Sequence, residues 1–319
     1  MSLQSHPAPL NGSSFLLPLV LGHRGACGYR PENTLEAFEL AIAQGADGVE
    51  CDLVPTKDGE LIIRHENWLN GTTDIESHPE FADRSRAGYS DGITENGFFS
   101  EDFDLVELAD VRAIERLPEV RPGSAKFDGQ FKIPTIDQLL AAPFMDGKTL
   151  VIEVKHGMHF TTRGMDIAGI LSEKLERSDW KARGIKVVIE SFDYEMMLLL
   201  KAACGADKKY VFLTEQARLP EGETHISASY LKQIAEDFDG VSLDLPLLLE
   251  LDETGTHTIS NGSIELAKAA GLEVYAWTLK AEDATTSVDE YFAKVALTGL
   301  DGIFVDQPDL LRSIVDGTA

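Results

Sequence analysis

Short apolar runs alternate with amphipathic segments along most of the chain. Eight runs rich in Val, Ile and Leu have the length of buried strands, and they lie at 16–22, 47–54, 149–154, 185–190, 209–213, 239–245, 272–278 and 301–305. Apolar residues with helical spacing occur at 34–44, 135–142, 163–178, 193–203, 227–236, 261–270, 284–297 and 308–316. Strand and helix in regular alternation predict an α/β fold, a TIM (β/α)8 barrel with its helices outside. An open doubly wound sheet is the alternative.

Residues 66–132 interrupt this rhythm with a polar stretch rich in Gly, Asp and Ser. Without it the chain has about 250 residues, the usual size of such a barrel. The stretch also contains six aromatic residues, which predict that it packs as a subdomain and is not a linker: Trp68, Phe81, Tyr89, Phe98, Phe99 and Phe103. We therefore expect one barrel domain over 1–319, with a subdomain at 66–132 inserted after the second strand.

Composition narrows the classes of partner. The chain has 54 acidic and 28 basic residues among 319, a net charge of −26, which argues against nucleic acid because few cations are available to neutralise phosphates. The negative net charge is compatible with an anionic substrate if a bound cation or a local Arg–Lys pair reverses the negative electrostatic field at the site. Cys27, Cys51 and Cys204 form neither a zinc motif nor an expected disulfide framework. No apolar run approaches the ~20 residues of a membrane span, so stable membrane insertion is not expected.

Candidate catalytic residues follow the predicted strands, and the active site of a TIM barrel lies at the carboxyl ends of its strands. His23 and Arg24 come directly after the first run. A lone histidine usually has a structural role. The adjacent arginine makes that role less favoured for His23, because burying both side chains without an acidic partner would be costly. His65 ends the run LIIRH, which follows a turn signal at 56–59. A hairpin there would carry the imidazole back to the strand end, where it could act as acid or base.

Paired carboxylates indicate a metal site. Glu50 and Asp52 lie two apart in GVECDLV, so a strand would point both to one face, where they repel unless a cation or a base joins them. A solvated edge strand is the alternative, but the apolar neighbours favour a buried strand. Glu153 and Lys155 repeat the spacing on the next predicted strand. Oxygen ligands without cysteine favour Ca²⁺ or Mg²⁺ over zinc. Lys155 is equally compatible with pairing to Glu153 and with contacting a phosphate.

The block from His23 to Glu66, HRGACGYRPENTLEAFELAIAQGADGVECDLVPTKDGELIIRHE, closely resembles the opening of the glycerophosphodiester phosphodiesterase family. Later segments resemble the same family, so the resemblance spans nearly the whole chain: IPTIDQLL (133–140), VIEVK (151–155), SFDYEMML (191–198), VYAWT (274–278) and DGIFVDQPD (301–309). Within the insertion, 70–84 and 97–118 resemble the branch with the larger insertion that is typified by exported bacterial enzymes.

The resemblance implies metal-dependent hydrolysis of glycerophosphodiesters to sn-glycerol 3-phosphate and an alcohol, with Ca²⁺ or Mg²⁺ as cofactor. It assigns His23 and His65 as the acid–base pair, Glu50, Asp52 and Glu153 as metal ligands, Arg24 and Lys155 to the phosphate, and Trp277 as an aromatic wall for the glycerol or the leaving group. The chain departs from the family pattern at Glu66, where many members have Asp, and at Val305, where Thr is frequent. Neither departure falls on an expected ligand, so both bear on substrate preference.

Two other functions stay open at this point. One is a phospholipase D-like or lyase activity on lysophospholipids, ranked lower because an acidic surface repels anionic membranes. The other is a non-catalytic barrel that holds an anion, although the full set of two histidines and three carboxylates argues against it. The sequence leaves the head group, the nucleophile (water or the glycerol 2-hydroxyl), the role of each histidine and the oligomeric state undecided.

The cellular location also has two interpretations. The family branch implies export. The first twenty residues carry no Lys or Arg before their short apolar stretch, so we do not expect them to form a signal peptide, which would leave the chain in the cytoplasm.

Overall fold

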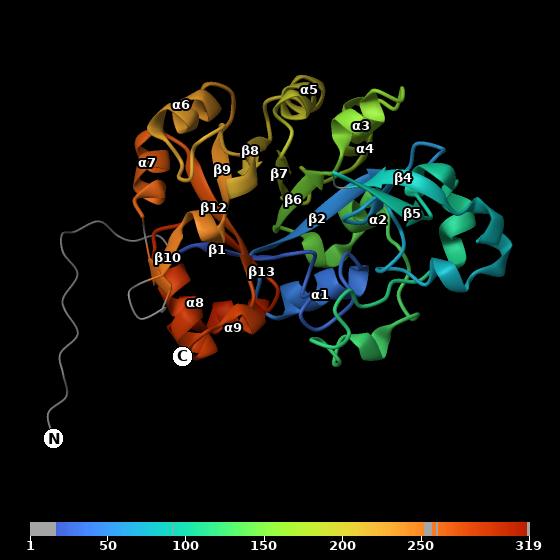
Figure 1. The fold of residues 1–319 in the computed structure, drawn as a ribbon, viewed down its shortest axis with the longest axis horizontal. Coiled ribbons are helices and arrows are strands. Elements are labelled where there is room, and N and C mark those ends of the chain that lie inside the picture. The colour runs from blue at the N-terminus through green and yellow to red at the C-terminus, as the bar shows by residue number, and fades with distance from the viewer. Residues whose placement is uncertain (1–16, 91, 252–256, 260, 318–319) are drawn as a thin grey trace, which may run out of the picture.

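Eight parallel strands close into a barrel in the computed structural model, which describes residues 17–317 except 91, 252–256 and 260 (Figure 1). The strands are β1 (Leu19–Gly22), β2 (Gly48–Pro55), β6 (Thr149–Val154), β7 (Lys186–Ser191), β8 (Lys209–Thr214), β9 (Gly240–Asp244), β12 (Glu273–Leu279) and β13 (Gly302–Val305). β1 pairs with both β2 and β13, which closes the ring. The predicted TIM barrel is confirmed, and the open doubly wound sheet is wrong.

Helices surround the barrel (Figure 1). They are α1 (Leu35–Ala43), α2 (Ile136–Ala141), α3 (Gly157–Thr161), α4 (Ile167–Arg177), α5 (Tyr194–Cys204), α6 (Ala228–Asp237), α7 (Ser263–Ala269), α8 (Val288–Ala296) and α9 (Pro308–Val315). The helix expected over 163–178 is shorter than predicted, and the separate α3 precedes it. Asp166 caps α4, because its side chain accepts a hydrogen bond of 2.9 Å from the backbone N–H of Gly169.

Apolar side chains pack inside the barrel, and Val151 and Val188 among them lie nearer the amino ends of their strands than Glu153 and Glu190. One cluster inside the ring consists of Leu21, Val151, Val188, Val211, Tyr275 and Phe304. Successive residues of a strand point to opposite faces, so Glu153 and Glu190, two positions after Val151 and Val188, also point inward. At the carboxyl ends of the strands, these acidic groups therefore lie next to the apolar cluster inside the barrel.

A hairpin leads from β2 into the insertion. β3 (Leu61–Ile63) runs antiparallel to β2, with Leu53 opposite Ile63, as the turn signal at 56–59 predicts. The insertion follows β3 and contains the two-stranded sheet of β4 (Arg86–Ser90) and β5 (Ile93–Gly97). Its 3-10 helices are η1 (Ile75–Ser77), η2 (Pro79–Arg84), η3 (Ser100–Asp102), η4 (Leu105–Asp110) and η5 (Ala125–Phe127). The sheet lies on one side of the barrel (Figure 1).

Aromatic side chains of the insertion pack against one another, with ring contacts between Phe81 and Phe103 and between Phe98 and Phe103. Phe81, Phe98, Phe99 and Phe103 are buried, whereas Tyr89 is 45% exposed. The remaining elements lie in the barrel loops: η6 (Pro143–Met145), η7 (Gln216–Arg218), η8 (Leu245–Leu247), β10 (Leu249–Leu251), β11 (His257–Ile259) and η9 (Ala281–Asp283).

Two expectations concern membranes and export. None of the described helices is both long enough and apolar enough to span a bilayer. The stretch on which the signal-peptide expectation depends falls almost entirely within 1–16, outside the described residues.

Candidate active site

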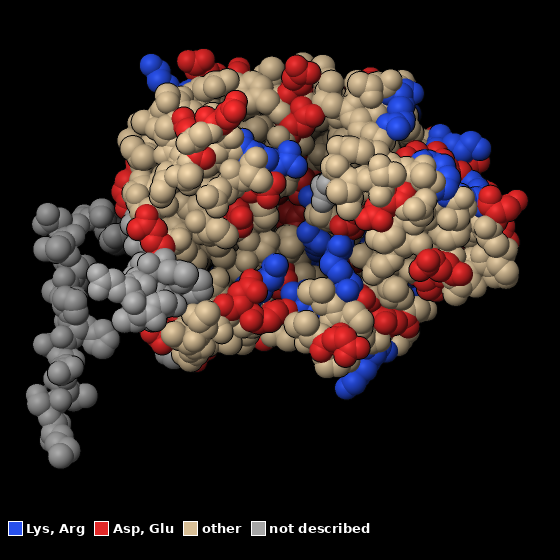
Figure 2. All heavy atoms as spheres, viewed as in Figure 1, with Lys and Arg blue, Asp and Glu red and all other residues tan. Residues whose placement is uncertain are grey.

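A pocket of about 500 Å³ opens at the carboxyl ends of the strands. Seven of the eight site residues expected from the sequence line it: His23, Arg24, Glu50, His65, Glu153, Lys155 and Trp277. The eighth, Asp52, does not line the pocket and is only 1% exposed. On the face shown in Figure 2, basic and acidic side chains border a central hollow. The pocket therefore brings together residues from β2, β6 and β12 and from the segments that follow β1, β3 and β6.

The loop after β1 fixes Arg24 above the acidic strand β2. The backbone N–H of Arg24 donates to Oε2 of Glu50 at 2.9 Å. Gly25 has φ +85°, and a Cβ built on it would lie 2.5 Å from the carbonyl carbon of Ala37 in α1. Only glycine allows both that backbone conformation and that close approach. The loop can therefore turn tightly against α1 and hold His23 and Arg24 over the strand ends.

Three glutamates converge inside the pocket. Carboxylate oxygens of Glu50, Glu153 and Glu190 lie within 4.8 Å of one another, and Glu153 is directly opposite Glu190 in the paired strands β6 and β7. Burial, and then repulsion by neighbouring carboxylates, raises the pKa of Glu50 and of Glu190 above the usual range. Among the described residues, Oε1 of Glu50 and Oε2 of Glu190 are buried without a hydrogen-bond partner.

Asp52 is bound by cationic and amide groups. Its carboxylate accepts a 2.8 Å hydrogen bond from Nδ2 of Asn33 and lies 3.3 Å from Nε of Arg24 and 3.4 Å from Nζ of Lys155. Burial would raise the pKa of Asp52, but Lys155 and then Arg24 hold it below the usual range. Lys155 also lies 2.7 Å from Oε1 of Glu153. It thus pairs with Glu153 and still faces the pocket, so its contact with phosphate stays a prediction.

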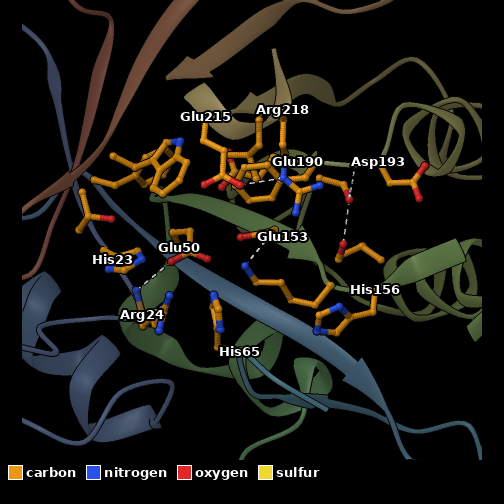
Figure 3. Close-up of a pocket in the computed structure, with 18 of the residues that line it drawn as sticks. His23, Arg24, Glu50, His65, Glu153, His156, Glu190, Asp193, Glu215 and Arg218 are labelled. Carbon is orange, nitrogen blue, oxygen red and sulfur yellow. Dashed lines mark hydrogen bonds and ion pairs between the residues drawn. The ribbon is translucent and has the colours of Figure 1, made fainter. Parts of the chain in front are cut away.

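Each histidine contacts one carboxylate through Nδ1. Nδ1 of His23 lies 2.7 Å from Oδ1 of Asp306, which follows β13, and Nδ1 of His65 lies 2.6 Å from Oε1 of Glu66. Burial, and then the charge of Arg24, lowers the pKa of His23 and brings that of His65 to about 4. Both rings are therefore neutral at pH 7, and because a carboxylate only accepts, Nδ1 carries the proton. In Figure 3 the labelled His23, Arg24 and His65 lie on one side of the pocket.

Aromatic and charged groups form the opposite side. The indole of Trp277 packs edge-on against Phe192, with ring centroids 5.4 Å apart, and its Nε1 donates to the carbonyl of Ser242 at 3.4 Å. Arg218 lies 4.6 Å above the ring of Phe192 and pairs with Glu215 at 2.9 Å. This side therefore offers an apolar wall next to the ion pair of Glu215 and Arg218, which are labelled in Figure 3.

Some pocket residues escaped the sequence analysis. In the run IKVVIE, Glu190 follows apolar residues as Glu153 does in TLVIE. This similarity was a sequence signal for a second acidic residue near a strand end. Glu215 and Arg218 follow β8 without any motif. The weak H-x-x-H spacing of His156 and His159 was interpreted as that of loop residues, yet both line the pocket, and His159 lies in α3.

The donor set of the pocket fits a hard divalent cation. Buried carboxylates with unpartnered oxygens are the ligands that Ca²⁺ and Mg²⁺ prefer, and a cation would remove the mutual repulsion of Glu50, Glu153 and Glu190. His23, Cys27 and Asp306 also lie within ligand distance of one another. Arg121 already binds Asp306 there, so that second group does not suit a cation.

The fold and the pocket define a TIM-barrel protein whose pocket combines histidines, buried carboxylates and cationic side chains. The model of the glycerophosphoryl diester phosphodiesterase family matches residues 23–310. The chain belongs to this family and is a glycerophosphodiester phosphodiesterase, which excludes the non-catalytic anion-binding barrel. Members of the family are generally metal-dependent.

Individual relatives are similar over most of the chain. A glycerophosphodiester phosphodiesterase of Arabidopsis thaliana, GDPD6, is 27% identical over 91% of this chain and 83% of its own length. A structure of a glycerophosphoryl diester phosphodiesterase from Silicibacter pomeroyi covers 94% of both chains with a TM-score of 0.70 and 22% identity. An Oleispira antarctica phosphodiesterase in complex with the product sn-glycerol-3-phosphate covers 94% of this chain and 97% of its own, with a TM-score of 0.66 and 22% identity.

Proposed function

We propose that the protein hydrolyses glycerophosphodiesters to sn-glycerol 3-phosphate and an alcohol, with a divalent cation and with His23 and His65 as the acid–base pair. The observation that carries the proposal is that both imidazoles line the same pocket as the Glu50–Glu153–Glu190 cluster. The sn-glycerol-3-phosphate in the Oleispira relative supports the nature of the product.

Arg24 and Lys155 bind the phosphate in this proposal. Both line the pocket, and a guanidinium offers a planar fork that matches two phosphoryl oxygens. Trp277 and Phe192 wall the side that faces the glycerol or the leaving alcohol. Burial of the phosphate among these groups keeps water from screening the charges.

His23 and His65 move the protons. Both are neutral without substrate, so either can accept a proton on Nε2 from the attacking oxygen. An anionic phosphodiester raises the pKa of a nearby imidazole because it favours the charged form. The second histidine then carries a proton on Nε2 and delivers it to the leaving oxygen. Whether the attacking oxygen belongs to water or to the glycerol 2-hydroxyl is an outcome of the product analysis below.

Glu50, Asp52 and Glu153 would hold the cation, joined by Glu190. When bound, a divalent cation polarises a phosphoryl oxygen and offsets the negative charge of the transition state. Asp52 also orients Arg24 and Lys155, since both cations lie within 3.4 Å of its carboxylate. The residues of the acidic cluster thus serve both the cation and the phosphate-binding side chains.

Substitution of the two histidines tests the acid–base assignment. We expect H23A and H65A each to lower kcat on glycerophosphocholine by about 10²–10⁴-fold, the usual contribution of a general acid or base, without a change in the melting temperature beyond that of a control. H78A is the matched control, because His78 pairs with Asp74 and Glu80 in the insertion and does not line the pocket. Normal rates in both pocket variants would overturn the assignment.

A substrate panel separates the hydrolase from the alternative activity on lysophospholipids. The chelator-treated protein would be assayed on glycerophosphocholine, glycerophosphoethanolamine and lysophosphatidylcholine, with Ca²⁺, Mg²⁺ or Mn²⁺ added back. We expect glycerol 3-phosphate as the product, restored by a divalent cation. A cyclic phosphate in the ³¹P spectrum would identify the glycerol 2-hydroxyl as the nucleophile, and faster turnover of the lysolipid would favour the alternative.

A further inference from the structure

The two histidines proposed as the acid–base pair, His23 and His65, contact carboxylates that lie outside the pocket. Asp306 and Glu66 contact Nδ1 of His23 and of His65, but neither carboxylate lines the pocket, whereas both imidazoles do. A carboxylate on Nδ1 fixes the tautomer and the ring plane of a histidine and leaves Nε2 for the reaction. What holds these two carboxylates therefore controls the geometry of the acid–base pair.

Two arginines of the insertion hold the carboxylates. Nη1 and Nη2 of Arg116 donate to the two oxygens of Glu66 at 2.8 and 2.7 Å. Nη2 of Arg121 donates to Oδ2 of Asp306. Both arginines belong to one short stretch, RLPEVR (116–121), although their partners lie 50 and 185 residues away in the sequence.

Further contacts anchor each guanidinium. Arg121 is 9% exposed and also donates to Oε1 of Glu282 at 2.5 Å and to the carbonyl of Cys27 at 3.2 Å. Arg116 also binds both oxygens of Glu32, at 2.7 and 2.8 Å. Bidentate arginine contacts are directional as well as strong, so they fix the position of the carboxylate and not only its charge.

Charge balance explains why arginines are needed here. Burial would raise the pKa of Asp306 and of Glu66, yet both lie below the usual range. The neighbouring histidines lower these two pKa values most, against the effect of burial, and the arginines lower them further. Without a cationic partner, a buried carboxylate would be costly, and would protonate or turn away from the histidine.

We propose that Arg116 and Arg121 are positioning residues that hold Glu66 and Asp306 so that both histidines keep Nδ1 protonated and present Nε2 to the substrate. The inference rests on the proposed acid–base role of His23 and His65. It gives the insertion a part in the reaction, since one of its loops reaches behind both imidazoles. If the arginines served only to attach the insertion to the barrel, their loss would affect stability but not the tautomers.

Kinetics on glycerophosphocholine test the inference. We expect R121Q to lower kcat by roughly 10–100-fold, the usual effect of removing a group that orients a functional histidine, with little change in KM. R116Q should lower kcat similarly and also raise KM, because Arg116 binds Glu32, which contacts Arg24 at 3.2 Å. The control is R84Q, because Arg84 pairs with Glu107 at 2.7 Å within the insertion and contacts none of the histidines in the described part of the chain; it should leave kcat and KM unchanged.

Nitrogen NMR of protein labelled with ¹⁵N-histidine provides the second readout. In the wild type, His23 and His65 should give the pattern of a neutral ring protonated on Nδ1, and R121Q should convert His23 to a mixture of tautomers. Lysine keeps the charge of Arg121 but not the fork that also reaches Glu282, so R121K should give intermediate values. R121K also replaces R121Q if the latter does not fold, and wild-type kcat and tautomer in R121K would then overturn the inference.

The outcomes separate the inference from the proposed function. If H23A and H65A are inactive but R116Q and R121Q keep wild-type kcat and tautomers, the positioning role is wrong and the proposed function stands. If the wild type cleaves no glycerophosphodiester, the proposed function fails, and the NMR spectra still decide whether the two arginines set the tautomers.

Discussion

Replacing Glu190 with Gln should stabilise the protein in chelator and weaken its response to Ca²⁺. Oxygens of Glu50, Glu153 and Glu190 lie within 4.8 Å of one another, and all three side chains are buried. In the absence of a cation, the neutral amide relieves repulsion with its neighbours. In the presence of a cation, the same change removes one anionic ligand. The two effects have opposite signs, which an ordinary packing defect would not produce.

The separation of the oxygens sets the magnitude. At 4.8 Å, the limit within which these oxygens lie, two ionised carboxylates repel by about 3 kcal/mol at an effective dielectric constant of about 20. Burial raises the pKa of Glu190, so protonation already relieves part of this repulsion. The melting temperature of E190Q in chelator should therefore rise by up to roughly 5 °C. Its Ca²⁺ affinity should fall about tenfold, which corresponds to about 1.4 kcal/mol.

Thermal melts in chelator and at graded Ca²⁺, together with titration calorimetry, measure both effects. E115Q is the matched control, because Glu115 is buried at 4% exposure but lies in the insertion, away from the cluster. It should change neither the Ca²⁺ affinity nor the Ca²⁺-induced shift in melting temperature. The reasoning is refuted if E190Q melts lower than the wild type in chelator and binds Ca²⁺ with unchanged affinity.

Three further predictions concern the loop after β1, the aromatic wall and acid stability. G25A should lose most of its kcat/KM, because the added Cβ would lie 2.5 Å from the Ala37 backbone at φ +85°; activity close to that of the wild type would contradict this. W277A should raise KM for glycerophosphocholine several-fold with little change in melting temperature, and an unchanged KM would exclude a substrate contact. The pKa of the Asp306 carboxyl is lower in the folded protein than in the unfolded chain. The ionised carboxylate therefore contributes fully to the free energy of unfolding above the unfolded pKa near 4, and this contribution is lost as the pH falls through the folded pKa. D306N should thus cost about 3 kcal/mol in urea unfolding at pH 7 and less at pH 3, and an equal cost at both would be inconsistent with this ion pair.

The barrel could be predicted because its elements have local signatures. The strand at Thr149–Val154 agrees with its prediction at both ends, since a strand covered on both faces is a continuous apolar run. The helix expected over 163–178 was too long, because the capping side chain of Asp166 decides where α4 begins, and apolar spacing alone does not show that. The sheet of β4 and β5 was not predicted, although Asp91-Gly92 is a typical hairpin turn signal.

The site was predictable where a residue belonged to a motif and not where it depended on register. An acidic residue at the end of the run IKVVIE indicates a strand end, but Glu190 joins the cluster because β7 pairs with β6 in a register that places it opposite Glu153, and the sequence contains no local sign of that register. Arg116 and Arg121 lie in a loop without helical or strand periodicity, and their partners are distant in the sequence. Contacts of this kind arise only when the insertion meets the closed barrel.

The pairing of His23 with Asp306 joins the first and the last strand of the ring, 283 residues apart. A chain still being made on the ribosome cannot orient His23 until β13 has emerged and taken its place beside β1. If His23 has the proposed acid–base role, the chain gains activity only late in its folding. The rate of turnover during synthesis or refolding would therefore report the number of molecules whose barrel has closed. Compact intermediates in which most of the barrel has formed would not contribute to it.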